Sequence, residues 1–146
     1  MRRDHYPPER NRVPAHLTLF HHLPPSIERE LAARLADAAG APPPRATIAG
    51  LMDLGEGTAL RVESSDLEAI RSDLADALHG LLTPQDRAPW RPHLTIQNKV
   101  TRRAARDVQA RLAAMPMPRA LAIRALALWR YQGGPWEPLR SWPFRR

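Results

Sequence analysis

The sequence predicts an α+β fold of two lobes, in which antiparallel sheets are flanked by helices and a cleft lies between the lobes. Segments with helical periodicity alternate along the chain with short segments typical of strands. Glycine-containing turns at 55–57 and 133–134 separate pairs of strand segments, as in antiparallel hairpins. The order helix, strand, turn, strand occurs twice, and this internal repeat predicts the two lobes.

The composition indicates a single globular domain, residues 1–146, whose lobes are interleaved along the chain by the repeat. A chain of 146 residues with 43% hydrophobic residues can bury a sizeable core. The absence of cysteine excludes disulfides and thiolate chemistry and is typical of a cytoplasmic protein. No apolar run approaches the roughly 18 residues of a membrane span. We therefore expect a cytoplasmic monomer with no membrane partner.

The charge favours an anionic partner. The formal net charge is +7, and Lys99 is the sole lysine among 22 lysine and arginine residues. The planar guanidinium of arginine suits bidentate phosphate contacts and stacks on bases. These arginines can equally be solvated surface residues, and the composition alone does not separate the two interpretations.

The expected elements follow from periodicity, caps and breakers. Segment 1–14 is irregular because it contains three prolines. Helices are expected from Ile27 to shortly before Gly40, from a Ser65/Glu68 capping box to about Leu82, and from an N-cap at Thr101 to Met115. The apolar stripe of the first includes Leu31 and Leu35, and Val108 and Leu112 of the third are expected to face inward. Strands are expected at 15–20, 47–54, 58–63, 93–97, 121–131 with a bulge near Ala125–Leu126, and 136–142.

One short phrase occurs twice. Residues 16–20 read His-Leu-Thr-Leu-Phe, and residues 93–97 read His-Leu-Thr-Ile-Gln. Because side chains alternate along a strand, His16 shares a face with Thr18, and His93 shares one with Thr95. Two such copies facing each other would supply two imidazoles for acid–base catalysis and two hydroxyls to hold an oxyanion.

Paired His-x-Thr-x motifs on strands resemble those of the two-histidine phosphoesterase superfamily, which includes 2′-5′ RNA ligases and 2′,3′-cyclic phosphodiesterases. The resemblance covers about residues 8–144 and implies a metal-independent enzyme without a cofactor. It implies action on RNA ends or cyclic nucleotides, by opening a 2′,3′-cyclic phosphate or by cleaving and joining a 2′-5′ linkage. In that interpretation His16 and His93 are catalytic, and Thr18 and Thr95 bind phosphate.

Comparison of the two halves of the repeat also predicts that a strand and a helix are missing ahead of the first motif. The second motif is preceded by the expected strand 58–63 and helix 65–82, whereas only a short irregular segment precedes the first. The resembling family carries a strand and helix ahead of its first motif. We therefore expect either that the true protein starts upstream of Met1 or that another molecule completes the first lobe.

Further residues are weaker candidates for substrate contact. Gln97 is expected on the face of His93, and Arg91 flanks the motif. Trp129 and Tyr131 share a strand face that can stack a base, or else belong to the core. His21 and His22 lack further ligands at zinc spacing, so no metal site is expected.

The rival interpretation of function is a basic RNA-binding module that keeps the fold but has no turnover. The intact pair of histidines favours the enzyme, because a binding module need not retain both. No nucleophile-elbow pattern and no glycine-rich phosphate loop is present, which argues against a serine hydrolase and against ATP-driven ligation.

Overall fold

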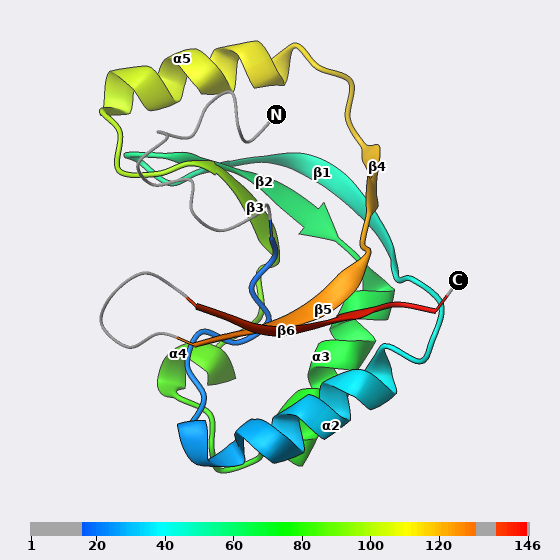
Figure 1. Ribbon diagram of the computed structural model, residues 1–146. Helices are drawn as coiled ribbons and strands as arrows, with labels where there is room; N and C mark the ends of the chain where they lie inside the picture. Colours follow the sequence, from blue (N-terminus) through cyan, green and yellow to red (C-terminus); the bar gives the residue numbers. More distant parts are fainter. Residues whose placement is uncertain (1–15, 131–136, 146) are drawn as a thin grey trace. The chain divides into compact units, whose positions relative to one another are not determined.

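The computed structural model describes residues 16–130 and 137–145, which divide into two compact units (Figure 1). Each unit is assembled from three separate stretches of the chain. The first unit comprises residues 16–18, Thr47–Glu63 and Arg91–Ala120, and the second comprises Leu19–Ala46, Ser64–Trp90 and the described residues from Leu121 onward. In chain order the elements are η2 (Pro25–Ile27), α2 (Glu28–Ala38), β1 (Arg45–Asp53), β2 (Thr58–Glu63), α3 (Ser65–Ala77), α4 (Pro84–Arg87), β3 (His93–Gln97), α5 (Arg102–Ala113), β4 (Arg119–Ala122), β5 (Ala125–Arg130) and β6 (Glu137–Pro143).

The first unit is built on a sheet with strand order β3-β2-β1-β4. Strands β1 and β2 form the predicted antiparallel hairpin, and Gly55 in its turn has a φ of 80°, a conformation that favours glycine. Gly57 lies against the end of β3, where an added Cβ would stand 2.5 Å from the carbonyl oxygen of Gln97. The hairpin turn therefore packs closely against the strand of the second motif, and this approach requires glycine.

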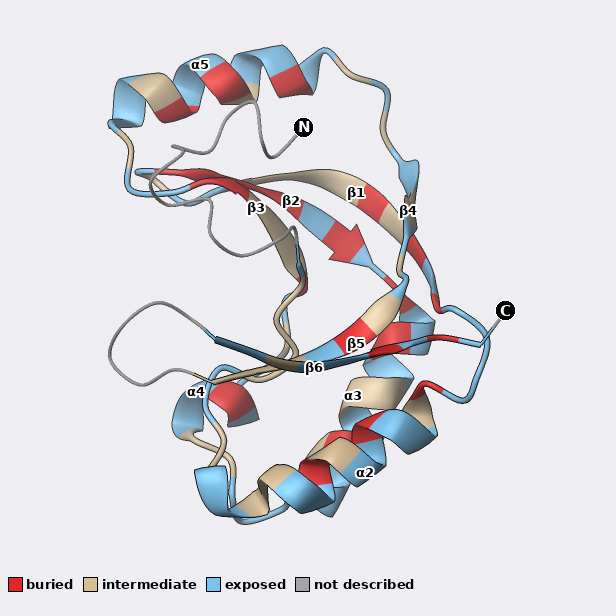
Figure 2. Cartoon of the chain, in the orientation of Figure 1, coloured by how far each residue is buried: buried red, intermediate tan, exposed pale blue. Residues whose placement is uncertain are grey.

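Helix α5 covers one face of this sheet. Thr101 caps the helix as predicted, because its Oγ1 accepts a hydrogen bond from the N–H of Ala104 at 3.1 Å. Val108 and Leu112 are buried, as expected, and Figure 2 shows buried positions along α5 and in β1, β2 and β3. The hydroxyl of Thr58 on β2 lies 3.4 Å from the carbonyl oxygen of Ala105, so α5 lies on the sheet face that carries Thr58.

The two faces of β2 differ in exposure. Leu60 and Val62 share the face of Thr58 by alternation and are 1% and 2% exposed. Arg61 and Glu63 point to the opposite face and are exposed. The sheet therefore has a core face beneath α5 and an opposite face on which Arg61 and Glu63 are exposed.

The second unit packs helices α2 and α3 with the antiparallel pair β5–β6. Its core consists of buried apolar side chains from all these elements and from the segment after β6: Leu31, Leu35, Ala39, Leu74, Leu78, Leu126, Trp142 and Phe144. Leu78 is fully buried, which is worth about 1.5–3 kcal/mol relative to an exposed leucine. Leu31 and Leu35 confirm the predicted inward stripe of the first helix.

Two helix and strand predictions need correction. Helix α3 is capped by Ser64, not Ser65, and ends at Ala77 rather than near Leu82, so Leu81 is exposed. The expected single strand 121–131 is divided into β4 and β5, which belong to different sheets. The slip in alternation thus marks the place where the chain leaves one sheet and enters the other, while a register shift occurs later, between Leu128 and Trp129.

The predicted strand at 15–20 is wrong for the described residues 16–20, which adopt no regular structure. An alternating pattern of side chains is compatible with a strand, but a strand also needs backbone hydrogen bonds to a neighbouring strand, which the pattern does not specify. Here the carbonyl oxygen of Leu19 accepts a hydrogen bond from a side chain, the guanidinium of Arg71, at 2.9 Å. Alternation therefore does not determine the relative orientation of His16 and Thr18.

The predicted α+β class with antiparallel sheets is confirmed. The expected cleft between lobes stays a prediction. In the part of the chain that the structure describes, none of the helices is long and apolar enough to cross a membrane.

Candidate active site

The second motif forms β3, and its histidine is oriented by the backbone. His93 is half-buried, and its Nδ1 lies 2.8 Å from the carbonyl oxygen of Arg91. A carbonyl oxygen can only accept, so Nδ1 carries the proton in this contact. Nε2 is thereby left as the nitrogen that can accept a proton from a substrate or, when protonated, donate one.

The register of the sheet defines the surroundings of His93. Arg61 of β2 stands directly opposite His93, and Ala59 stands opposite Thr95. Residues that face each other in an antiparallel pair lie on the same side of the sheet. Thr95 is half-buried and shares this side with His93, as predicted from alternation within the strand.

Gln97 does not share the exposed side of His93. The pairing shifts between Thr58 opposite Gln97 and Ala59 opposite Thr95, so the alternation slips at Ile96. Gln97 is only 3% exposed, and its Oε1 accepts a hydrogen bond from the Thr58 hydroxyl at 2.9 Å. The register shift turns this side chain into the core beneath α5, which contradicts the accessible position expected for it.

The division of the chain between the two units falls within the first motif. His16 is exposed and Thr18 is half-buried, and both are grouped with the first unit, which also contains His93 and Thr95. All four residues of the two His-x-Thr pairs thus belong to one compact unit. The chain enters the second unit at Leu19.

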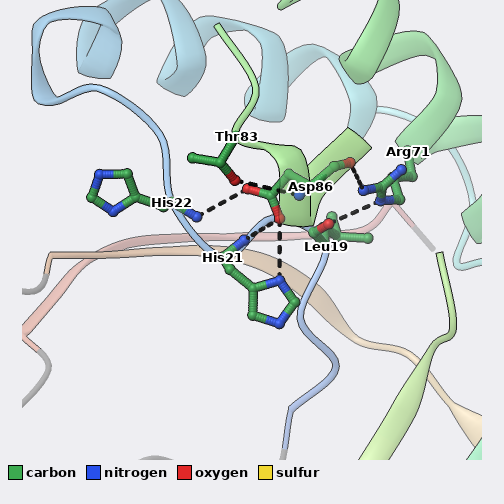
Figure 3. Close-up of polar contacts among 6 residues, drawn as sticks. All are labelled: Leu19, His21, His22, Arg71, Thr83 and Asp86. Carbon is green, nitrogen blue, oxygen red and sulfur yellow. Dashed lines mark hydrogen bonds and ion pairs between the residues drawn. The ribbon is translucent and has the colours of Figure 1, made fainter. Parts of the chain in front are cut away.

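A polar network holds the chain immediately after the first motif (Figure 3). The Asp86 carboxylate accepts hydrogen bonds from the backbone N–H groups of His21 at 2.8 Å and His22 at 3.0 Å. The ring Nδ1 of His21 lies 3.1 Å from the same carboxylate. Arg71 donates to the carbonyl oxygens of Leu19 at 2.9 Å and Asp86 at 2.7 Å.

The electrostatics of Asp86 show that the network favours an ionised carboxylate. The residue is 1% exposed, and burial by itself raises the pKa of Asp86. The N–H donors of His21 and His22 and the nearby His21 ring outweigh burial, so the pKa of Asp86 lies below its ordinary value. Burial lowers the pKa of the Arg71 guanidinium, and Asp86 opposes that shift.

Arg71 also contacts two aromatic rings. Its guanidinium carbon lies 4.7 Å from the centre of the Phe20 ring and 5.6 Å from the Trp90 ring. Phe20 ends the first motif phrase, and Trp90 precedes the second motif. Asp86 and Arg71 therefore connect the segment that follows the first motif to the segment that precedes the second motif.

Sequence reasoning missed both Asp86 and Arg71. The sequence does contain the N-cap of α4, because the Thr83 side chain accepts a hydrogen bond from the Asp86 N–H at 3.3 Å. The partners of the Asp86 carboxylate could not be predicted from neighbouring residues, because they come from a segment about 65 residues earlier in the chain.

The remaining predicted residues, Arg91, Trp129 and Tyr131, lie outside the two motifs in the sequence. Arg91 is exposed, and Trp129 is half-buried on β5 opposite Pro138. Tyr131 lies outside the described residues. A shallow groove of about 340 Å³ lies between α2 and the β5–β6 pair, and no residue of either motif lines it.

The described residues form no cluster of side chains suited to a metal ion. Within residues 16–130 and 137–145, no three histidine, aspartate or glutamate side chains lie close enough together to hold an ion. His21 is engaged with Asp86, and His79 is exposed beyond the end of α3.

Comparisons with known proteins agree with this architecture. A family model described as the 2′-5′ RNA ligase superfamily matches residues 1–135. The fold resembles the crystal structure of a Thermus thermophilus protein, with a TM-score of 0.56 and 18% identity over 90% of this chain and 78% of that chain. It also resembles Escherichia coli LigT complexed with 3′-AMP, with a TM-score of 0.52 and 20% identity over 99% of this chain and 87% of that chain.

These structural likenesses concern the fold alone, because both identities are low. No curated protein matches the chain in sequence.

Proposed function

Because this chain belongs to the 2′-5′ RNA ligase superfamily, we propose that it is a metal-independent phosphoesterase that uses His16 and His93 on RNA ends or cyclic nucleotides. The observation that carries the proposal is the orientation of His93. Its Nδ1 proton is directed to the Arg91 carbonyl oxygen, so Nε2 is available for proton transfer. His16 and Thr18 belong to the same unit as His93 and Thr95, which supports a shared site.

The chemistry of a 2′,3′-cyclic phosphate needs two proton transfers. Water attacks the phosphorus, and one imidazole accepts the proton that the water loses. The bond to one ribose oxygen breaks, and the second, protonated imidazole donates a proton to that leaving oxygen. If a ribose hydroxyl attacks in place of water, the same steps form a phosphodiester linkage.

The two threonines are assigned to the phosphate. Negative charge grows on the non-bridging oxygens as the new bond forms, and preorganised donors stabilise that charge. The hydroxyls of Thr18 and Thr95 stand two residues after each histidine and can donate to these oxygens. The complex of the similar LigT structure with 3′-AMP supports a nucleotide as the ligand class.

The test is direct. The protein is incubated with 2′,3′-cyclic AMP and with an oligoribonucleotide that ends in a 2′,3′-cyclic phosphate, each with and without EDTA. We expect monophosphate products in both conditions and none from the His16→Ala/His93→Ala double variant. Binding of the oligoribonucleotide without any turnover would overturn the proposal in favour of the RNA-binding module.

A further inference from the structure

A row of three residues crosses the sheet at the level of His93. Gly50 of β1 stands opposite Arg61 of β2, and Arg61 stands opposite His93 of β3. Directly opposed residues in an antiparallel pair have Cβ atoms about 4.5–5.5 Å apart. Arg61 is therefore an immediate neighbour of His93, on the face of the sheet away from α5.

The guanidinium of Arg61 remains on this face. Its Nη1 donates to the Glu63 carboxylate at 2.7 Å, and Glu63 lies on the same side of β2. A Cβ added at Gly50 would stand 3.5 Å from Nη2, so the side chain extends over the position where glycine leaves room. The guanidinium thus lies over β1 and near Glu63, on the same face of the sheet as His93.

We propose that Arg61 binds the phosphate on which His93 acts, exchanging Glu63 for the non-bridging oxygens of the substrate. This inference rests on the proposed function and adds a phosphate-binding residue that lies outside both motifs. A guanidinium presents its donors in a planar fork that matches two phosphate oxygens. In the free protein the Glu63 carboxylate, which has the same sign of charge as a phosphate, accepts a hydrogen bond from Nη1.

The exchange is favoured by the exposure of the ion pair. The Arg61 side chain is 47% exposed and that of Glu63 is 64% exposed. Ion pairs in such solvated positions contribute little to stability, so Arg61 can change partners at small cost. A phosphate oxygen that gains charge during the reaction is a better acceptor than a solvated carboxylate that stays unchanged.

The experiment compares Arg61→Gln with Arg103→Gln, which removes the same charge from an exposed position of α5 in the same unit. We expect Arg61→Gln to lower kcat/KM for 2′,3′-cyclic AMP about 10- to 100-fold, the range for loss of a hydrogen bond to a charged group. Arg103→Gln should change it less than twofold. Arg61→Lys should recover part of the loss, because it restores charge but not the fork.

Glu63→Gln separates phosphate binding from a merely structural ion pair. If Arg61 acted only through Glu63, the Arg61→Gln and Glu63→Gln variants would lose activity equally. Phosphate binding instead predicts that Glu63→Gln keeps or raises kcat/KM, because the competing carboxylate is gone. Equal losses in the two variants, or equal kcat/KM for Arg61→Gln and Arg103→Gln, would overturn the inference and leave the proposed function standing.

Absence of turnover in the wild type would refute the proposed function but not decide the role of Arg61. In that case the dissociation constant for 3′-AMP, measured by calorimetry, decides it. A rise of about tenfold or more in Arg61→Gln alone supports the phosphate contact. An unchanged constant refutes it, and thermal melts establish that each variant is folded.

Discussion

The carboxylate of Asp86 binds both the backbone N–H and the ring Nδ1 of His21, at 2.8 and 3.1 Å. The two residues are 65 positions apart in the chain, and the carboxylate is fully buried. This contact fastens the segment after the first motif to α4, which precedes the second. It is therefore the first place to test how the motif-bearing segments are held.

Replacing Asp86 with Asn should destabilise the protein. The amide keeps the shape but loses the charge, and its NH₂ group would face N–H donors that need an acceptor. Loss of a buried charged acceptor with several donors costs about 2–4 kcal/mol in the free energy of unfolding. Urea unfolding measures the change, and Asp73→Asn, at an exposed position of α3, is the matched control. Equal stability of the two variants would contradict a structural role for the buried carboxylate.

The acid sensitivity of the fold should depend on Asp86. Its pKa is lower in the folded protein than in the unfolded chain, so below neutral pH the unfolded state binds more protons. The stabilisation is complete above the unfolded value of about 3.9 and is lost as the pH falls through the folded value. Wild-type stability should therefore drop more steeply than that of Asp86→Asn below about pH 4.

Some acid dependence should remain in Asp86→Asn. The N–H of Gly55 and the side chain of Gln109 lower the pKa of Asp53 as well. If the free energy of unfolding falls equally with pH in the wild type and in Asp86→Asn between pH 2 and 5, the assignment to Asp86 is refuted.

Removal of either histidine that we propose as catalytic, His16 or His93, should lower the rate strongly. His16→Ala and His93→Ala are each expected to reduce cyclic-phosphate hydrolysis about 10²–10⁴-fold, the usual contribution of a positioned acid or base. The double variant should lose much less than the product of the two effects, because the groups act together. His93→Asn is a useful companion, since its amide N–H can still reach the Arg91 carbonyl oxygen. Full activity in any of the three single variants would exclude that histidine from catalysis.

The hydroxyl of Thr95 should affect kcat more than KM. Thr95→Val keeps the shape and the strand preference of the side chain but removes the donor. A donor aimed at developing negative charge acts mainly in the transition state, so kcat should fall about 10- to 100-fold. Steady-state kinetics with 2′,3′-cyclic AMP give the separation. A change in KM alone would indicate ground-state binding only.

Gly57 should be needed for the position of β3. An Ala Cβ would stand 2.5 Å from the Gln97 carbonyl oxygen, which forces the backbone of the hairpin turn or of β3 to move. We expect Gly57→Ala to cost about 1–3 kcal/mol of stability. Gly50→Ala is the control, because its Cβ would meet Arg61 at an ordinary 3.5 Å. Equal melting temperatures for the two variants would show that the turn relaxes freely.

Local chemistry explains which elements could be predicted from the sequence. The glycine turn at 55–57 and the alternation of 58–63 and 93–97 predict β2 and β3, because backbone freedom and side-chain period are properties of neighbouring residues. The Thr101 cap and the inward Val108 and Leu112 of α5 follow for the same reason. The two His-x-Thr pairs, and with them the family, are likewise visible in the sequence.

Only the tertiary structure decided which backbone groups and side chains meet across the chain. It gave residues 16–20 no regular strand, and it placed the Arg71 guanidinium on the Leu19 carbonyl oxygen. It turned Gln97 into the core through a register shift that no alternation reveals. It brought Arg61 opposite His93 and Asp86 against His21, since strand register and burial depend on packing between distant segments rather than on sequence neighbours.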